Sequence, residues 1–121
     1  METIKLFDSE LKVMEVIWQH NSCITAKEIS NIIAEDIGWN KNTTYTVIKK
    51  LVSKGAIERL EPNFKCRSLI TREQVQAHET RKLIDKLYDG SLKTFFASFI
   101  KKENLSQAEI EEIKDIIDKE L

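Results

Sequence analysis

Two amphipathic helical segments open this chain, and their caps fix where each one begins. The first covers about residues 8–20, with Asp8 or Ser9 as its expected cap. The second begins after Thr25, which forms a capping-box pattern with Glu28. Both segments repeat apolar residues at helical spacing, which predicts two helices packed by those faces. The expected core residues are Leu11, Val13, Met14, Ile17, Trp18, Ile29, Ile32, Ile33 and Ile37.

A third helix is expected between two glycines. Gly38 ends the second segment, the third runs roughly from Asn42 to Lys54, and Gly55 ends it. At 100° per residue, its side chains separate into two faces. The apolar face holds Thr44, Val47, Ile48 and Leu51. The opposite, polar face holds Asn42, Thr46, Lys49 and Ser53, flanked by Tyr45 and Lys50.

A short hairpin follows the three helices. Two strand-like runs, residues 57–60 and 66–70, flank a turn that contains Pro62 and Asn63, and residues 23–24 form a further short extended stretch. Three helices followed by a hairpin is the order of a winged helix-turn-helix. The sequence therefore predicts a mostly α fold with a small β-hairpin wing. Residues 1–70 are expected to form this winged-helix domain.

Charge is distributed unevenly along the chain. The whole chain carries a formal charge of −1, but residues 41–70 carry +5, between an N-terminal part at −4 and a C-terminal part at −2. A basic segment in a nearly neutral chain indicates a polyanion-binding face confined to that segment. The alternative is a lysine-rich surface that is simply solvated.

The basic segment coincides with the third helix and the hairpin, which suggests DNA binding. In a helix-turn-helix, the second of the paired helices enters the major groove with its first turns at base edges. Asn pairs with adenine, and Thr hydrogen-bonds or places its methyl group against thymine. Two alternatives stay open: Asn42 is only a helix cap, and Tyr45 is only a packing residue. The predicted DNA-binding residues are Asn42, Thr43, Tyr45, Thr46, Lys49, Lys50 and Lys54 on the helix, and Arg59, Lys65 and Arg67 on the wing.

Three more helices are expected over residues 71–121. The first covers about residues 71–88, and the second begins at residue 91. The third begins at a second capping box at Ser106 and runs to residue 121. About fifty residues cannot easily bury these apolar stripes alone. We therefore predict a helical dimerisation region and a homodimer, the alternative being a monomer whose helices fold back onto the first domain. The predicted dimerisation residues are Leu92, Phe95, Phe96, Phe99, Ile100, Ile110, Ile113 and Ile117.

Several function classes lack any signature. No apolar run is long enough for a membrane span and no leader pattern opens the chain, so we expect a cytoplasmic protein without membrane insertion. Cys23, Cys66, His20 and His78 form no metal-ligand spacing. There is no glycine-rich phosphate loop and no recognisable nucleophile with a histidine partner. We expect no metal, no cofactor and no enzymatic activity.

Four segments carry a resemblance to a known family. LKVMEVIW at residues 11–18 and WNKNTTYTVIKKLVSKG at 39–55 resemble the penicillinase and methicillin-resistance repressors, the BlaI/MecI family. The similarity continues through KLYDG at 86–90 and ENLSQAEIEE at 103–112, and so covers nearly the whole chain. The resemblance implies a dimeric winged-helix repressor of palindromic operators, with an N-terminal DNA-binding domain and a C-terminal dimerisation region.

The resemblance also implies a means of inactivation. In this family a membrane sensor protease, on detecting a β-lactam, triggers cleavage of the repressor in its dimerisation region. The family's Asn-Phe scissile bond aligns with Ser98-Phe99. The alternative is that the phenylalanines here are dimer core only. A copper-sensing sister group uses C-terminal cysteines, and this chain has none after Gly90. The remaining alternatives are a winged-helix protein-interaction module and a repressor that answers a different signal, such as a metal.

Overall fold

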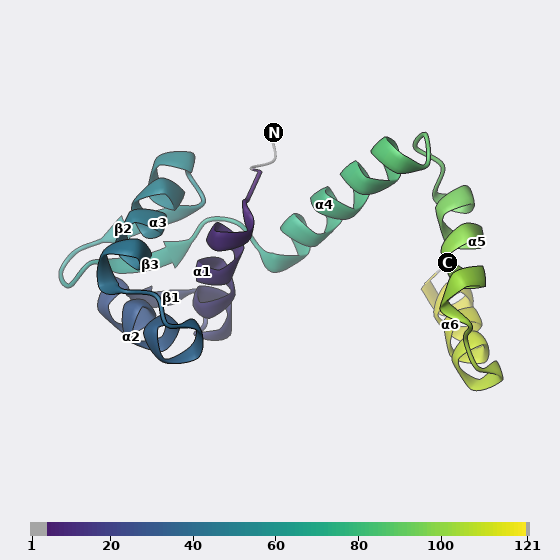
Figure 1. The fold of residues 1–121 in the computed structure, drawn as a ribbon, viewed down its shortest axis with the longest axis horizontal. Helices are drawn as coiled ribbons and strands as arrows, with labels where there is room; N and C mark the ends of the chain where they lie inside the picture. Colours follow the sequence, from purple (N-terminus) through teal and green to yellow (C-terminus); the bar gives the residue numbers. More distant parts are fainter. Residues whose placement is uncertain (1–4, 121) are drawn as a thin grey trace. The chain divides into compact units, whose positions relative to one another are not determined.

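The computed structural model describes residues 5–120, which form two compact units. The first unit ends at His78 and the second begins at Glu79. The elements, labelled in Figure 1, are α1 (Asp8–Gln19), β1 (Cys23–Thr25), α2 (Ala26–Ile37), α3 (Lys41–Lys54), β2 (Ile57–Leu60), β3 (Lys65–Ser68), α4 (Arg72–Leu87), α5 (Leu92–Glu103) and α6 (Gln107–Glu120).

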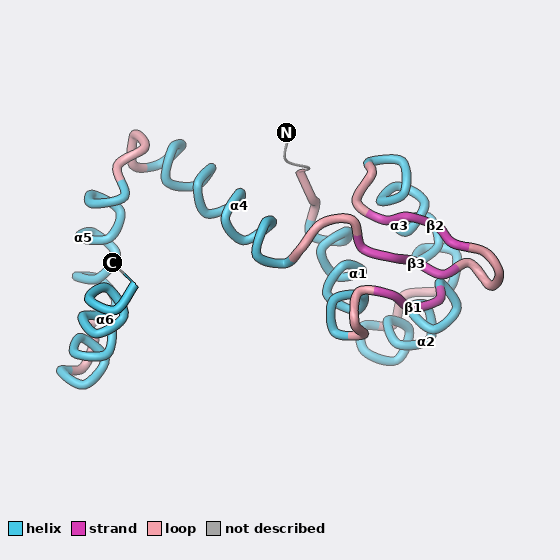
Figure 2. The backbone as a smooth tube through the Cα atoms, turned by 180° about the vertical axis from the view of Figure 1, so that it is seen from behind, coloured by secondary structure: helices cyan, strands magenta, loops and turns pink. Residues whose placement is uncertain are grey.

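The first unit combines three helices with a small antiparallel sheet in the order β1-β3-β2 (Figure 2). The predicted hairpin is β2 with β3, in which Ile57 pairs with Ser68 and Leu60 with Lys65. The short extended stretch at residues 23–25 is β1, a third strand on the other side of β3, with Ile24 opposite Cys66. This arrangement is a winged helix-turn-helix, and the predicted fold class is confirmed.

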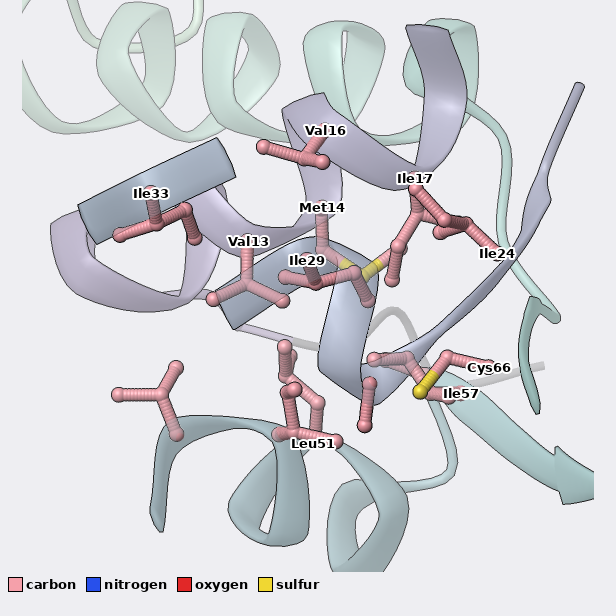
Figure 3. Packing of buried hydrophobic residues seen from close by; sticks show 14 residues of the cluster. Val13, Met14, Val16, Ile17, Ile24, Ile29, Ile33, Leu51, Ile57 and Cys66 are labelled. Carbon is pink, nitrogen blue, oxygen red and sulfur yellow. The ribbon is translucent and has the colours of Figure 1, made fainter. Parts of the chain in front are cut away.

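The core of the first unit lies where the three helices meet the sheet (Figure 3). Met14 and Ile17 of α1, Ile29 of α2 and Leu51 of α3 are at most 1% exposed. Burying each such side chain contributes about 1.5–3 kcal/mol through the hydrophobic effect. Ile37, predicted to be part of this core, is instead 45% exposed, because it is the last residue of α2 and lies past the packed turns.

Helix caps confirm most of the predicted boundaries. The Glu28 N–H donates to the Thr25 hydroxyl at 3.1 Å, and Gly38 and Gly55 end α2 and α3 at positive φ. The expected cap of α1, Asp8 or Ser9, is wrong. Phe7 occupies the cap position, and its N–H donates to the Glu10 carboxylate at 2.8 Å. Glu10 therefore caps the helix from inside it, which leaves Asp8 and Ser9 in the first turn.

The first turn of α4 belongs to the first unit. The Trp18 indole N–H donates to the Ser68 hydroxyl at 3.1 Å and to the Ile70 carbonyl at 3.0 Å, and so ties the end of β3 to α1. The Arg72 guanidinium donates to the Glu15 carboxylate at 2.9 Å, and Val75 is 6% exposed. These contacts explain why the first unit extends into α4.

The second unit consists of the rest of α4 with α5 and α6. In the loop between α4 and α5, Asp89 and Gly90 adopt positive φ, and the Ser91 hydroxyl caps α5 by accepting the Thr94 N–H. Ser106 and Glu109 form the predicted reciprocal capping box at 3.1 and 3.2 Å. Tyr88, Phe95 and Phe99 pack ring against ring. Within the described part of this unit, only Ile84 is fully buried.

Neither a membrane span nor a metal-binding cluster occurs among the described residues. No helix there is long and apolar enough to cross a membrane. No group of three or more His, Cys, Asp or Glu side chains is placed to hold a metal ion in residues 5–120.

Candidate nucleic-acid interface

The polar face of α3 is the centre of the candidate site. α3 begins at Lys41 because the Asn40 side chain accepts the Thr43 N–H at 2.8 Å and so caps the helix. The open question about Asn42 is thereby answered: it is not the cap. It lies in the first turn, and its side chain is exposed. Asn42 and Thr43 therefore keep their polar groups available to a ligand.

The helical period places Asn42, Thr46, Lys49 and Ser53 on one exposed face. The opposite face, from Thr44 to Leu51, is buried against α1 and α2. The periodicity predicted this separation, and the structure confirms it. Hydrogen-bonding and cationic groups therefore lie together on the side of α3 that faces solvent.

A shallow groove of about 770 Å³ runs along this face. It lies between the start of α1 and the second half of α3. Phe7 and Ser9 line one side, and Lys49 and Lys50 line the other. The two lysines give the groove a cationic edge that suits an extended anion.

The cations of the basic segment divide into two groups. Within the described residues, no carboxylate lies within ion-pair distance of Lys41, Lys49, Lys50 or Lys65. The other three cations are paired inside the first unit: Lys54 with Glu10, Arg59 with Glu61, and Arg67 with Glu58.

Lys54 is the most strongly engaged of the paired cations. Its ammonium donates to Glu10 at 2.6 Å and to the Lys5 carbonyl at 2.9 Å, and it lies 4.5 Å from the centre of the Phe7 ring. Glu10 is only 2% exposed. A phosphate would have to compete with this buried carboxylate for the ammonium. The role predicted for Lys54 as a phosphate contact stays a prediction, and its contacts favour a structural role.

The wing is the hairpin of β2 and β3 with its turn at residues 61–64. Arg59, Lys65 and Arg67 are exposed on it, as a backbone contact requires. Arg59 donates to the Glu61 carboxylate at 2.7 Å, and this bond lowers the pKa of Glu61. This pair and the Arg67–Glu58 pair are both exposed to solvent, so breaking either one to bind a phosphate costs little free energy.

Phe64 at the wing tip was missed by the sequence reasoning. Its ring packs edge-on against Tyr45 of α3, with 6.0 Å between ring centroids and 84° between the planes. Tyr45 is half-buried, so the packing role that stayed open for it is present in the structure. One sequence feature could have indicated this role for Phe64: it is an aromatic residue in a polar turn.

The residues predicted to form a dimer or to be cleaved lie in the second unit. Leu92, Phe96, Phe99 and Ile117 are 42–58% exposed. Four others are half-buried: Phe95, Ile100, Ile110 and Ile113. Ser98, on the N-terminal side of the predicted scissile bond, is exposed within α5.

Sequence comparisons relate nearly the whole chain to known repressors. The family model described as penicillinase repressor matches residues 6–119. The methicillin resistance regulatory protein MecI of Mammaliicoccus sciuri is 32% identical, over 98% of this chain and 97% of that protein. The penicillinase repressor of Bacillus licheniformis is 28% identical, over 94% of this chain and 90% of that protein.

Solved structures show the same fold for part of the chain. The DNA binding domain of the repressor BlaI matches with a TM-score of 0.55 and 30% identity, over 61% of this chain and 93% of that one. The monomeric form of Bacillus licheniformis BlaI, in complex with the blaP half-operator, matches with a TM-score of 0.53 and the same identity and coverage.

Proposed function

Because the chain belongs to the penicillinase repressor family, we propose that it is a transcriptional repressor that binds a two-fold symmetric DNA operator as a homodimer. The observation that carries this proposal is the exposed face of α3, where Asn42, Thr46 and Lys49 lie together on a winged helix. A related domain of the same fold was solved in complex with a half-operator. The proposed function implies a cytoplasmic location and no catalytic activity.

Base reading is assigned to the first turns of α3. Lying in the major groove, Asn42, Thr43 and Thr46 reach base edges, where Asn pairs with adenine and Thr contacts thymine or accepts a hydrogen bond. Tyr45 adds a hydroxyl group to the same turns. These residues discriminate between sequences because their polar groups lose hydrogen bonds against a wrong base.

The sequence-independent part of the DNA affinity is assigned to the cations. Lys49 and Lys50 have no carboxylate partner among the described residues, so they contact phosphates without giving up an internal ion pair. On the wing, Lys65 is free in the same sense, while Arg59 and Arg67 must first release Glu61 and Glu58. Such contacts position the protein on the duplex and carry no sequence information.

The exposed apolar side chains of the second unit support the homodimer. Phe96, Phe99, Ile116 and Ile117 are 42–61% exposed on α5 and α6. Large apolar patches on a soluble domain mark interaction sites. A second copy of the same helices covers them symmetrically. Linking two DNA-binding units in this way gives the second half-site contact a high effective concentration.

Inactivation is proposed to occur by cleavage between Ser98 and Phe99, in response to a β-lactam or a related signal and through a membrane sensor protease. Support comes from the exposure of both residues on α5. Cutting there separates Phe99 and all of α6 from the DNA-binding unit. A fragment of residues 1–98 is then expected to bind the operator much more weakly than the full chain, and equal binding would contradict this mechanism.

The decisive experiment is a binding titration of the full chain at several salt concentrations. The DNA upstream of its own gene is compared with random duplexes of equal length. A specific repressor binds its operator at least about 10³-fold more tightly than random DNA, with a steep dependence on salt. Equal and weak binding to both kinds of DNA, unaltered by changing Asn42, Tyr45 and Lys49 to Ala, would rule out the DNA-binding function.

A matched pair of lysine variants locates the interface. Lys49→Ala is expected to lower the slope of log affinity against log salt by about 0.9, the value for one lost phosphate contact. Lys27→Ala on α2 removes the same charge from another exposed position and is expected to leave the slope unchanged. If both variants reduce the slope equally, the effect is one of net charge and α3 is not the interface.

A further inference from the structure

We propose that Phe64 is a positioning residue, which orients Tyr45 on α3 and thereby contributes to the base preference of the protein. The proposal rests on the proposed DNA-binding function. In it Phe64 does not contact DNA and acts only through its contact with Tyr45. Its basis is the contact between the wing tip and α3.

The two rings meet in a favoured geometry. Their centroids are 6.0 Å apart and their planes are at 84°, so one ring presents its edge to the face of the other. Both side chains are half-buried and pack against the hydrophobic core of the first unit. Tyr45 therefore has one side fixed by the wing, while α3 carries Asn42 and Thr46 on its exposed face.

Phe64 is itself held in place from two directions. Its backbone carbonyl accepts the N–H of Ala26, a fully buried residue at the start of α2, at 2.9 Å. The Arg59 guanidinium lies 3.7 Å from the centre of the Phe64 ring, and Glu61 holds that guanidinium. Phe64 also adopts a φ of 50°, which is uncommon for a bulky residue and persists only where the surroundings hold it.

These contacts form a continuous row across the wing and α3. Arg59 contacts Phe64, Phe64 contacts Tyr45, and the Lys41 ammonium lies 5.5 Å from the centre of the Tyr45 ring. Two cations thus flank two aromatic rings. The row links the position of the wing to the orientation of the one aromatic side chain in the predicted base-reading turn.

Fixing the Tyr45 ring matters because a base-edge contact requires the side chain to be held close to its productive geometry. Without the Phe64 ring, Tyr45 keeps its place on α3 but loses the partner that limits its orientation. An edge-to-face aromatic contact corresponds to about a 2- to 12-fold change in an equilibrium constant. That range is the expected size of the lost base discrimination.

The test uses the full chain and a library of randomised duplexes. Bound duplexes are selected and sequenced for the wild type, Phe64→Leu, Phe64→Tyr and Tyr45→Ala, and affinities for single base-pair variants of the wild-type motif are then measured at one salt concentration. We expect Phe64→Leu to lose about 2- to 12-fold of the preference at the base pair affected by Tyr45→Ala. Phe64→Tyr keeps the ring and is expected to keep the preference.

Two controls separate positioning from stability. The first is Leu60→Ala, which changes another half-buried apolar side chain of the wing, at the end of β2. The second is thermal unfolding, which is recorded for every variant. Loss of folded protein lowers binding to all duplexes by one factor and leaves the ratios between them unchanged. On the Tyr45→Ala background, Phe64→Leu is expected to cause no further change in base preference.

The outcomes distinguish this proposal from the function on which it rests. If Phe64→Leu selects the same motif as the wild type, with unchanged ratios between base-pair variants, Phe64 has only a packing role and the proposal is overturned. If the wild type itself enriches no motif, the failure lies with the proposed function.

Discussion

The ammonium of Lys54 lies 2.6 Å from the carboxylate of Glu10, a side chain that is 2% exposed. The same carboxylate accepts the N–H of Phe7 and so caps α1. One ion pair therefore joins the start of α1 to the end of α3. This pair therefore holds α3, which carries the proposed base-reading residues, against the rest of its unit.

Removing Lys54 is expected to destabilise the fold. Lys54→Met leaves the Glu10 charge buried without a partner, and we expect a loss of about 3 kcal/mol in the free energy of unfolding, at the low end for buried pairs because Lys54 itself is 29% exposed. Urea unfolding monitored by circular dichroism measures this loss. Lys50→Met, an exposed lysine on the same helix, is the matched control and is expected to change stability by less than about 0.5 kcal/mol.

A double variant tests the cause. Glu10→Gln combined with Lys54→Met removes both charges and keeps a side-chain oxygen for the Phe7 N–H, so we expect most of the lost stability to return. Operator binding by this double variant is expected to keep the wild-type salt slope. A slope reduced by about 0.9 would instead identify Lys54 as a phosphate contact.

Two asparagines, two residues apart, are expected to give opposite results. Asn40→Ala removes the cap of α3 and is expected to cost about 1 kcal/mol in the free energy of unfolding. Asn42→Ala alters an exposed side chain that makes no cap, so stability is expected to stay within about 0.5 kcal/mol of the wild type. Its effect appears in DNA binding, as a loss of about 1–3 kcal/mol of discrimination at one base pair per half-site. The reverse assignment of effects would show that Asn42 acts only in folding.

The exposed phenylalanines of α5 are expected to hold the dimer. Phe96→Ser with Phe99→Ser removes two side chains that are 42% and 48% exposed. Within one chain the change also removes the stacking of Phe99 on Phe95, so circular dichroism is recorded to show that the helices remain. Sedimentation analysis is expected to show the wild type as a dimer and this variant as a monomer at the same micromolar concentration. Lys101→Ser on the same helix is the control and is expected to remain a dimer. A wild type that is monomeric at all concentrations tested would contradict the proposed assembly.

The two cysteines are expected to differ in reactivity. Cys23 is exposed on β1, whereas Cys66 is buried on β3. Burial raises the pKa of the Cys66 thiol to about 11, with a smaller contribution from Cys23. At neutral pH a thiol reagent is expected to label Cys23 rapidly and Cys66 only when the fold opens, because the thiolate is the reactive form. Labelling followed by mass spectrometry checks this, and equal rates at the two positions would be inconsistent with the burial of Cys66.

The raised pKa of Cys66 also makes stability depend on pH. The folded chain keeps the thiol protonated, so the contribution is complete below the unfolded pKa of about 9 and is lost as the pH rises towards 11. Between pH 8 and pH 10.5 the wild type is expected to lose about 2 kcal/mol more than Cys66→Ala. Urea unfolding at the two pH values gives the comparison, and the alanine variant accounts for the other groups that titrate.

Local chemistry made much of the fold readable from sequence. Thr25 and Ser106 each precede a helix that they cap, and Gly38 and Gly55 each end one, because capping and positive φ depend on a few adjacent residues. The cap of α1 was missed because Glu10 acts from inside the helix, bonding to the backbone N–H of an apolar residue.

The sequence by itself determined the three-helix and hairpin order, the polar face of α3 and the position of its charges, since periodicity and composition require no knowledge of distant contacts. Only the tertiary structure decided which cations have a carboxylate partner. Lys54 and Glu10 are 44 residues apart in the chain, and Tyr45 meets Phe64 across two elements. Such pairs form because the core brings α1, α3 and the wing together, and an ammonium or an aromatic ring takes whichever partner the packed backbone places within reach.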